Sequence, residues 1–259
     1  MSWLQNLFLG VLQALTEFLP ISSSGHLVLG KHFLNIITPG TALEVVLHMG
    51  TLCSILVYYF RDLLDVSKGL FSKDNTESRN LVFAVLIGTI PAVIVGFGFE
   101  DIIDEMFSSV QLVSFSMIFT GIVLFSTKFR KNNNQDIVTL QQGFLIGCAQ
   151  ALAITPGISR SGMTISIAIL IGISNRHAAK FSFFLAIPAL FGAGILKLDD
   201  AMALIHEVST VTLAVGFISS FIVGYLVIDL LIKLISKDKF WMFAIYCWGV
   251  GLISLLISI

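Results

Sequence analysis

Two segments far apart in the chain repeat each other, and each interrupts an apolar stretch. The first runs from Gly10 to Gly25 and the second from Gly147 to Gly162. Gly, Gln-Ala-Leu, Ile-Ser, Ser and Gly recur with the same spacing, while the proline is shifted by one position, from Pro20 to Pro156. Proline removes a backbone donor and ends or bends a helix. The chain is therefore predicted to consist of two related halves, each with one broken helix.

The amino-acid composition indicates the environment in which these two breaks lie. Hydrophobic residues make up 56% of the chain, charged residues only 12%, and the mean hydropathy is +0.94. A soluble domain has about 25% charged residues. We therefore expect an all-α integral membrane protein that is surrounded by lipid. The net charge of −1 gives no general attraction to nucleic acid, so no nucleic-acid partner is expected.

Six apolar stretches are long enough, or nearly so, to cross a hydrocarbon core of about 30 Å. They lie near 43–60, 81–99, 111–128, 181–197, 209–232 and 240–258. The stretches 3–18 and 141–155 are too short, and each is followed by a second short apolar piece, at 23–37 and 161–173. Broken backbone at membrane depth is tolerated only inside protein or beside a wet cavity. Both are predicted to be re-entrant helical hairpins.

The basic residues of the loops test this topology, because cytoplasmic loops carry an excess of Lys and Arg. If the first hairpin enters from outside, the outer loops hold only Lys31 and Lys197. The inner loops then hold all the other loop bases, which are Arg61, Lys68, Lys73, Arg79, Lys128, Arg130, Lys131, Arg176, Lys180, Lys233, Lys237 and Lys239. Both termini are predicted outside, and 1–136 and 137–259 become inverted-topology repeats. The loop 61–80 is expected to carry a short surface helix, and 130–136 to link the repeats.

Small polar residues follow both breaks and suit the start of a helix. The free amides of a first helical turn, together with the helix dipole, form an anion site. Two such ends that converge at mid-membrane would hold a phosphate-like group. The expected substrate-binding residues are Ser22, Ser24, Gly25, Ser159, Ser161 and Gly162. The alternative is that these residues only cap helices.

Charged side chains accompany the breaks. An intramembrane arginine usually marks function, and the guanidinium of Arg160 matches phosphate oxygens. The alternative for Arg160 is a structural ion pair with Glu17. Glu17 shares a helix face with Gln13, and the two could bind a divalent cation, Mg²⁺ or Ca²⁺. Otherwise Glu17 orients another catalytic group, or is a buried neutral acid.

A serine and a histidine complete the candidate catalytic set. His26 follows Ser23 by three positions, so the two side chains are expected to be neighbours on a helix. Such a pair permits proton transfer and nucleophilic catalysis, although a lone membrane histidine is often a hydrogen-bonded core residue. Glu44 is a weaker candidate for cation binding, and His48 is expected to be structural.

The segment from Gln13 to His26 resembles the (E/Q)xxxE motif region of the bacterial undecaprenyl-diphosphate phosphatase family, and the segment from Pro156 to Gly162 resembles its PGxSRSG motif. The resemblance covers the whole chain. It implies hydrolysis of undecaprenyl diphosphate in the plasma membrane, which recycles the lipid carrier of the cell wall and confers bacitracin resistance. It also implies a site that opens to the periplasm and a divalent cation that assists. Gln13 is the weaker of the two residues that the motif allows, so a metal role must rest on Glu17, and Met163 stands where the family usually has a small residue.

Carried over by position, the resemblance assigns catalytic roles to Ser23, His26, Glu17 and Arg160, with Ser23 as nucleophile. A polyprenyl diphosphate lipid is the expected substrate, and a homodimer is compatible with the pattern. The rival is a transporter or flippase for an anionic polyprenyl lipid, because inverted repeats with broken helices are also a transporter design. The sequence leaves open whether Ser23 attacks phosphorus or positions a water.

Overall fold

The computed structural model describes residues 2–34, 36, 42–72, 75–130, 135–236 and 238–258. Across these residues the structure is helical, and the one β contact is an isolated bridge between Gln135 and Ile173. The helices are α1 Trp3–Phe18, α2 Ser23–Phe33, α3 Ala42–Tyr58, α4 Phe60–Phe71, α5 Thr76–Gly98, α6 Glu100–Met106, α7 Val110–Ser126, α8 Leu140–Leu152, α9 Arg160–Leu170, α10 Asn175–Leu196, α11 Leu198–Glu207, α12 Thr210–Ile235 and α13 Phe243–Ile257. Short 3-10 turns precede the 130–136 segment and α13, at Thr127–Phe129 and Phe240–Met242.

Five helical stretches are long and apolar enough to cross a membrane: α5, α10 and α12, and also α7 and α13 when each is taken with its adjoining 3-10 turn, over Val110–Phe129 and Phe240–Ile257. A sixth span results if α3 and α4 are counted together, although α4 bends away from α3 by 69°. The structure thus agrees with an all-helical membrane protein of five to six spans. The surface helix expected within 61–80 is α4, which begins directly after the bend at Tyr59. Most of the expected linker 130–136 lies outside the described residues.

The two breaks fall where proline predicts them. α1 ends at Phe18, ahead of Pro20, and α8 ends at Leu152, ahead of Pro156. Each is followed by a short helix, α2 or α9, so both predicted helix–break–helix hairpins are present. None of these four helices is long enough to span a bilayer alone.

Small residues let the first helix of each hairpin pack closely on a long helix. α1 packs along α12, and α8 packs along α5. A Cβ on Gly10 would lie 2.5 Å from the Gly216 carbonyl oxygen, and one on Gly147 would lie 2.1 Å from the Gly88 oxygen. These backbones therefore touch, which is the usual way for helices to associate in lipid.

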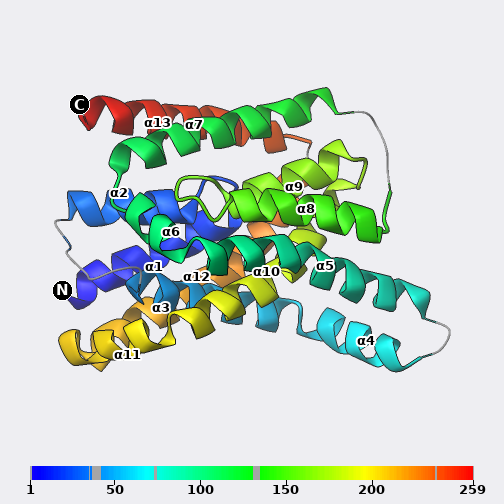
Figure 1. The fold of residues 1–259 in the computed structure, drawn as a ribbon, viewed down its shortest axis with the longest axis horizontal. Helices are drawn as coiled ribbons and strands as arrows, with labels where there is room; N and C mark the ends of the chain where they lie inside the picture. The colour runs from blue at the N-terminus through cyan, green and yellow to red at the C-terminus, as the bar shows by residue number, and fades with distance from the viewer. Residues whose placement is uncertain are drawn as a thin grey trace.

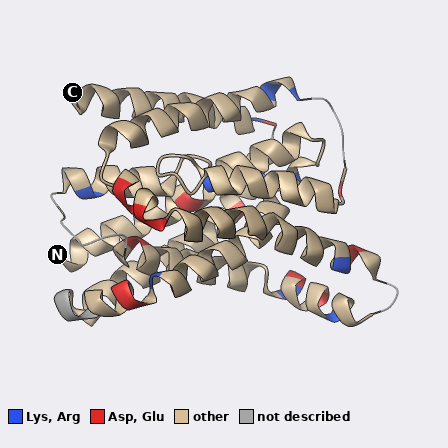
Figure 2. Ribbon diagram, in the orientation of Figure 1, with Lys and Arg blue, Asp and Glu red and all other residues tan. Residues whose placement is uncertain are grey.

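The long helices run side by side along the longest axis of the molecule (Figure 1). Both termini lie at one end of this bundle, together with α6 and α11. Charged residues gather toward the two ends, and the acidic turn of α6 lies at the end that holds the termini (Figure 2). Few charged residues lie deep between the ends, and Glu17 and Arg160 are among them.

Candidate active site

The first break places Glu17 and Ser23 on the two sides of a sharp turn. Glu17 lies in the last turn of α1, and the chain leaves the helix at Leu19. Ser22 then adopts a left-handed backbone with φ of 69° and caps α2, accepting the Gly25 N–H at 3.2 Å. A non-glycine residue in that region is strained, and such strain is concentrated at functional sites. The turn starts α2 at Ser23, beside the end of α1.

The second break also combines a positive φ with a serine cap, but here these features belong to two different residues. Gly157 takes a φ of 91°, and Ser159 caps α9 by accepting the Gly162 N–H at 3.0 Å. Thr120 of α7 holds this turn, because its hydroxyl donates to the Gly157 carbonyl at 3.2 Å and accepts the Ser159 N–H at 3.1 Å. The break is therefore fixed to a neighbouring span before it meets any ligand.

The two breaks touch each other inside the protein. The Ser161 hydroxyl donates to the Leu19 carbonyl at 3.2 Å, and the Gly157 N–H donates to the Ser24 hydroxyl at 3.3 Å. A Cβ on Gly25 would lie 3.2 Å from the Gly157 Cα, so the backbones meet closely there. The predicted convergence of the two hairpins is thus present, and it involves both sets of expected binding residues.

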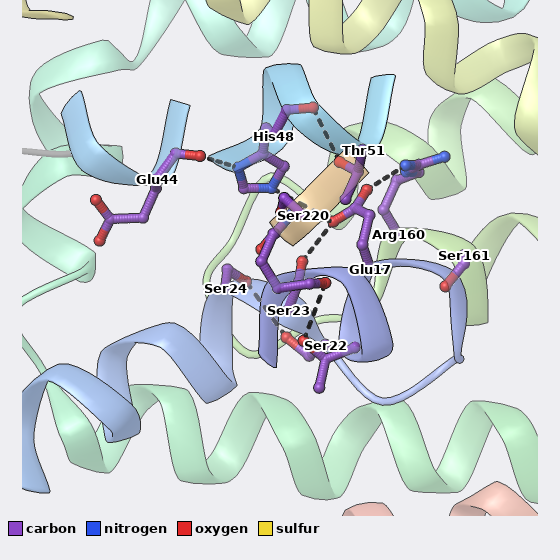
Figure 3. A network of polar contacts seen from close by, with 12 residues as sticks. Glu17, Ser22, Ser23, Ser24, Glu44, His48, Thr51, Arg160, Ser161 and Ser220 are labelled. Carbon is purple, nitrogen blue, oxygen red and sulfur yellow. Dashed lines mark hydrogen bonds and ion pairs between the residues drawn. The ribbon is translucent and has the colours of Figure 1, made fainter. Parts of the chain in front are cut away.

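Glu17 is the centre of the polar network that results (Figure 3). Its Oε1 forms an ion pair with Arg160 from the second break. Its Oε2 accepts the Ser23 hydroxyl at 2.6 Å and the Gln13 amide at 3.2 Å, and lies 3.4 Å from Nε2 of His48. The carboxylate is only 6% exposed, so these contacts replace water. The structural ion pair left open by the sequence is therefore real, and it joins the two halves.

His26 lies apart from this network. Its Nδ1 is 2.7 Å from the Ser22 carbonyl oxygen, and its Nε2 is 2.9 Å from the Tyr246 hydroxyl of α13. The two rings are also stacked. Both ring nitrogens are thus engaged away from Ser23, whose hydroxyl turns to Glu17. Proton transfer between Ser23 and His26 remains a prediction, and the structure shows His26 joining the first break to α13.

A cavity of about 290 Å³ opens beside the network. Its polar lining includes Glu17, Ser23, Arg160 and His48. Most of the remaining wall is apolar and comes from α5, α6 and α10, with Val93, Phe97, Ile103, Phe107, Leu190 and Leu196 among its residues. Such a cavity suits an amphiphile, with an anionic head at the breaks and a hydrocarbon chain along the apolar wall.

Comparison with known proteins agrees with this geometry. A family model described as bacitracin resistance protein BacA matches residues 6–253. The chain belongs to the BacA family. An undecaprenyl-diphosphatase of Halothermothrix orenii is 40% identical over 255 residues, which is 97% of this chain and 96% of that protein. Undecaprenyl-diphosphatase 4 of Bacillus thuringiensis strain Al Hakam is 38% identical, and the alignment covers 98% of this chain and 96% of the relative.

The divalent cation expected in a BacA-family protein can be tested against the donor atoms. Among the described residues, no group of three His, Cys, Asp or Glu side chains is arranged to hold a metal. Both oxygens of Glu17 already face donors, one of them the cationic Arg160, and Gln13 turns its amide nitrogen toward Glu17. This donor set does not fit a cation shared by Glu17 and Gln13, because Arg160 would repel it.

Two contacts of this BacA-family site were not expected from the sequence. His48, assigned a structural role, reaches Glu17 from α3, and its Nδ1 is fixed 2.6 Å from the Glu44 carbonyl oxygen. Glu44 itself is buried, lines the cavity and pairs with Lys31. No local spacing reveals either contact, since each joins side chains from different helices. The available signal was the presence of Glu44, His48 and Thr51 on one otherwise apolar stretch.

Proposed function

We propose that this chain hydrolyses undecaprenyl diphosphate to undecaprenyl phosphate and inorganic phosphate at the junction of the two breaks. The observation that carries the proposal is the Ser23 hydroxyl bound to the Glu17 carboxylate, which Arg160 pairs from the other half. This group lies at the polar end of a cavity with an apolar wall. Relatives that match nearly the whole chain are named undecaprenyl-diphosphatase, which supports the same substrate.

Charge complementarity supports the position of the diphosphate. Arg160 begins α9, so its guanidinium and the free amides of α9 approach an anion from the same side. The first turn of α2 faces it from the other hairpin. In such reactions the rate enhancement comes mainly from stabilising the charge on the transferred phosphoryl group. Ser22, Ser24, Gly25, Ser159, Ser161 and Gly162 serve this site by shaping and capping the two turns.

The chemical step uses Ser23 as nucleophile. Its Oγ forms a bond to the terminal phosphorus while the bond from that phosphorus to the bridging oxygen breaks, and undecaprenyl phosphate leaves with the bonding electrons. The hydroxyl proton passes to Oε2 of Glu17, its hydrogen-bond partner at 2.6 Å. Water then hydrolyses the phosphoserine, and inorganic phosphate leaves as Ser23 regains a proton. His26 supports the turn that presents Ser23.

The arrangement of the helices supports an inverted repeat. α1 of the first half packs on α12 of the second, and α8 of the second half packs on α5 of the first. Each half thus inserts its hairpin helix against a long helix of the other, as a pseudo-twofold axis requires. With the inner loops basic, both termini and the α6 end face outward, and the cavity faces the periplasm of a bacterial plasma membrane. A homodimer stays a prediction.

Phosphate release from a polyprenyl diphosphate by detergent-solubilised protein tests the proposal. Ser23→Ala should lower the rate roughly 1,000-fold or more, because an activated nucleophile is lost. The matched control is Ser67→Ala on α4, where the hydroxyl bonds only its own helix. A flippase releases no phosphate in detergent, so the absence of phosphate release by the wild-type protein would favour the flippase alternative. Wild-type turnover by Ser23→Ala would remove Ser23 as nucleophile.

The cation remains a prediction from the family resemblance, and the reaction above contains no step that depends on it. The same assay tests it after chelation and re-addition of Mg²⁺ or Ca²⁺. Unchanged phosphate release after chelation would contradict a cation requirement.

A further inference from the structure

Gln150 occupies the same place in the second hairpin that Gln13 occupies in the first. Each lies in the last turns of its helix, α8 or α1, just before the break. Both are buried, with Gln13 at 0% and Gln150 at 2% exposure. The sequence repeat therefore places an amide beside the site from each half of the molecule.

The two amides differ in what they bind. Gln13 donates from Nε2 to Glu17, one helical turn later. The corresponding position in the second hairpin is Ile154, which offers no acceptor. Among the described residues, neither Nε2 nor Oε1 of Gln150 has a hydrogen-bond partner. The first amide is therefore partly satisfied, since its Nε2 binds Glu17 while its Oε1 has no partner, whereas neither polar atom of the second amide has one among the described residues.

A buried amide without partners is unfavourable, since its donors and acceptor lose water and gain nothing. Native proteins pair nearly all such groups, and an exception needs an explanation. Gln150 lines the cavity that Arg160 and Ser23 also line. The backbone of α8 approaches that of α5 through Gly147 and Gly88, and Thr89 of α5, which also lines the cavity, donates its hydroxyl proton to the Val85 carbonyl. The missing partner is therefore expected to enter through the cavity.

We propose that Gln150 is a substrate-binding residue, whose Nε2 donates to a non-bridging oxygen of the diphosphate. Gln150 lines the cavity, and no hydrogen bond among the described residues holds its terminal amide, so the amide is free to turn its N–H groups toward a ligand there. A neutral donor suits this place, since Arg160 already supplies a positive charge and a second cation would raise the desolvation penalty of the empty site. This inference rests on the proposed phosphatase function and assigns the diphosphate a contact from α8.

The test is Gln150→Met, which keeps the length of the side chain and removes both polar atoms. Steady-state phosphate release from a polyprenyl diphosphate gives KM and kcat, and thermal unfolding in the same detergent gives the apparent Tm. We expect KM to rise roughly 10- to 100-fold, the range for a hydrogen bond to a charged group. The apparent Tm should stay level or rise, because an unpaired polar group leaves the interior. The matched control is Gln141→Met, an exposed position on the same helix.

The combination of weaker binding with undiminished stability separates a ligand contact from a packing role. An unchanged KM in folded Gln150→Met would overturn the assignment, and would point to an internal water as the partner of the amide. Loss of folded protein in both Gln150→Met and Gln150→Leu would overturn it too, because the amide would then serve the fold. If the wild type itself released no phosphate, the proposed function would fail before this inference was tested.

Discussion

Removing either partner of the Glu17–Arg160 ion pair should destabilise the protein, whereas removing both should cost far less than the two single losses added together. The side chains are 5% and 14% exposed, so each charge depends on the other. Arg160→Met leaves a buried carboxylate with only neutral donors and His48. Glu17→Gln leaves a guanidinium whose remaining partner is the Ser182 carbonyl, at 3.4 Å.

The expected size follows from the burial. Breaking a buried pair by removing one partner costs about 3–5 kcal/mol, while replacing both partners by neutral groups is often near neutral. Arg160 lines the cavity and is therefore not fully removed from water, so the cost is expected in the lower half of the range for a broken buried pair. We expect about 3 kcal/mol for each single variant and about 2 kcal/mol for the double variant, which gives a coupling free energy near 4 kcal/mol.

Reversible unfolding in mixed micelles, followed through tryptophan fluorescence, would measure the three free energies. All three variants should lose phosphate release, so the variants are compared by their free energies of unfolding and not by their activities. Additive effects, with a coupling below about 0.5 kcal/mol, would show that the two charges do not depend on each other. The account of how the two halves are joined would then be wrong.

Two further predictions concern parts of the molecule outside the network. Gly147→Ala should destabilise the protein by about 1–3 kcal/mol, because the new Cβ would lie 2.1 Å from the Gly88 oxygen of α5. The control is Gly249→Ala, whose new Cβ would have no heavy atom within 4 Å. Equal free energies of unfolding for the two variants would contradict close packing of α8 on α5. Burial lowers the pKa of Lys197, but its hydrogen bonds to Asp104 and Glu100 outweigh this effect and raise the pKa above its usual value. The folded state thus holds that proton more tightly, so its contribution is complete below about pH 10.4 and is lost at higher pH, as the lysine deprotonates. The free energy of unfolding, measured from pH 9 to 11.5, should show this decline in the wild type but not in Lys197→Met. Identical slopes of the free energy of unfolding against pH in the two proteins would refute the prediction.

The sequence predicted the hairpins and spans well because their causes are local. Pro20 and Pro156 stand among serine and glycine residues and mark helix ends, whereas Pro91 and Pro188 lie in long apolar stretches that continue as α5 and α10. Apolar length decides what can cross a bilayer. The bend between α3 and α4 was expected only as a loop with a surface helix. α4 is amphipathic rather than evenly apolar, and composition alone does not give the angle at which such a helix leaves a span.

The site was predicted less completely because its contacts join distant segments. Spacing placed His26 beside Ser23, but α2 starts at Ser23 from a strained turn that directs its hydroxyl to Glu17. His26 instead reaches Tyr246 on the last helix. His48 approaches Glu17 from α3, which no pattern in the first hairpin could reveal. Local rules thus placed these polar residues at the breaks, and tertiary packing decided their partners.

The unequal sequences of the two breaks are consistent with one candidate site at their junction. If both breaks carried a glutamate, at position 17 and at its equivalent, two like charges would be buried close together, which is unfavourable. Two buried arginines would be unfavourable for the same reason. The ion pair of Glu17 and Arg160 has no net charge. The second break has Ile154 at the position equivalent to Glu17, and the first break has Ser23 at the position equivalent to Arg160. In the proposed mechanism, the first hairpin supplies the nucleophile and its proton acceptor, and the second supplies the positive charge. Neither hairpin carries all of these groups alone, so the mechanism predicts that catalysis requires the contact between the two hairpins.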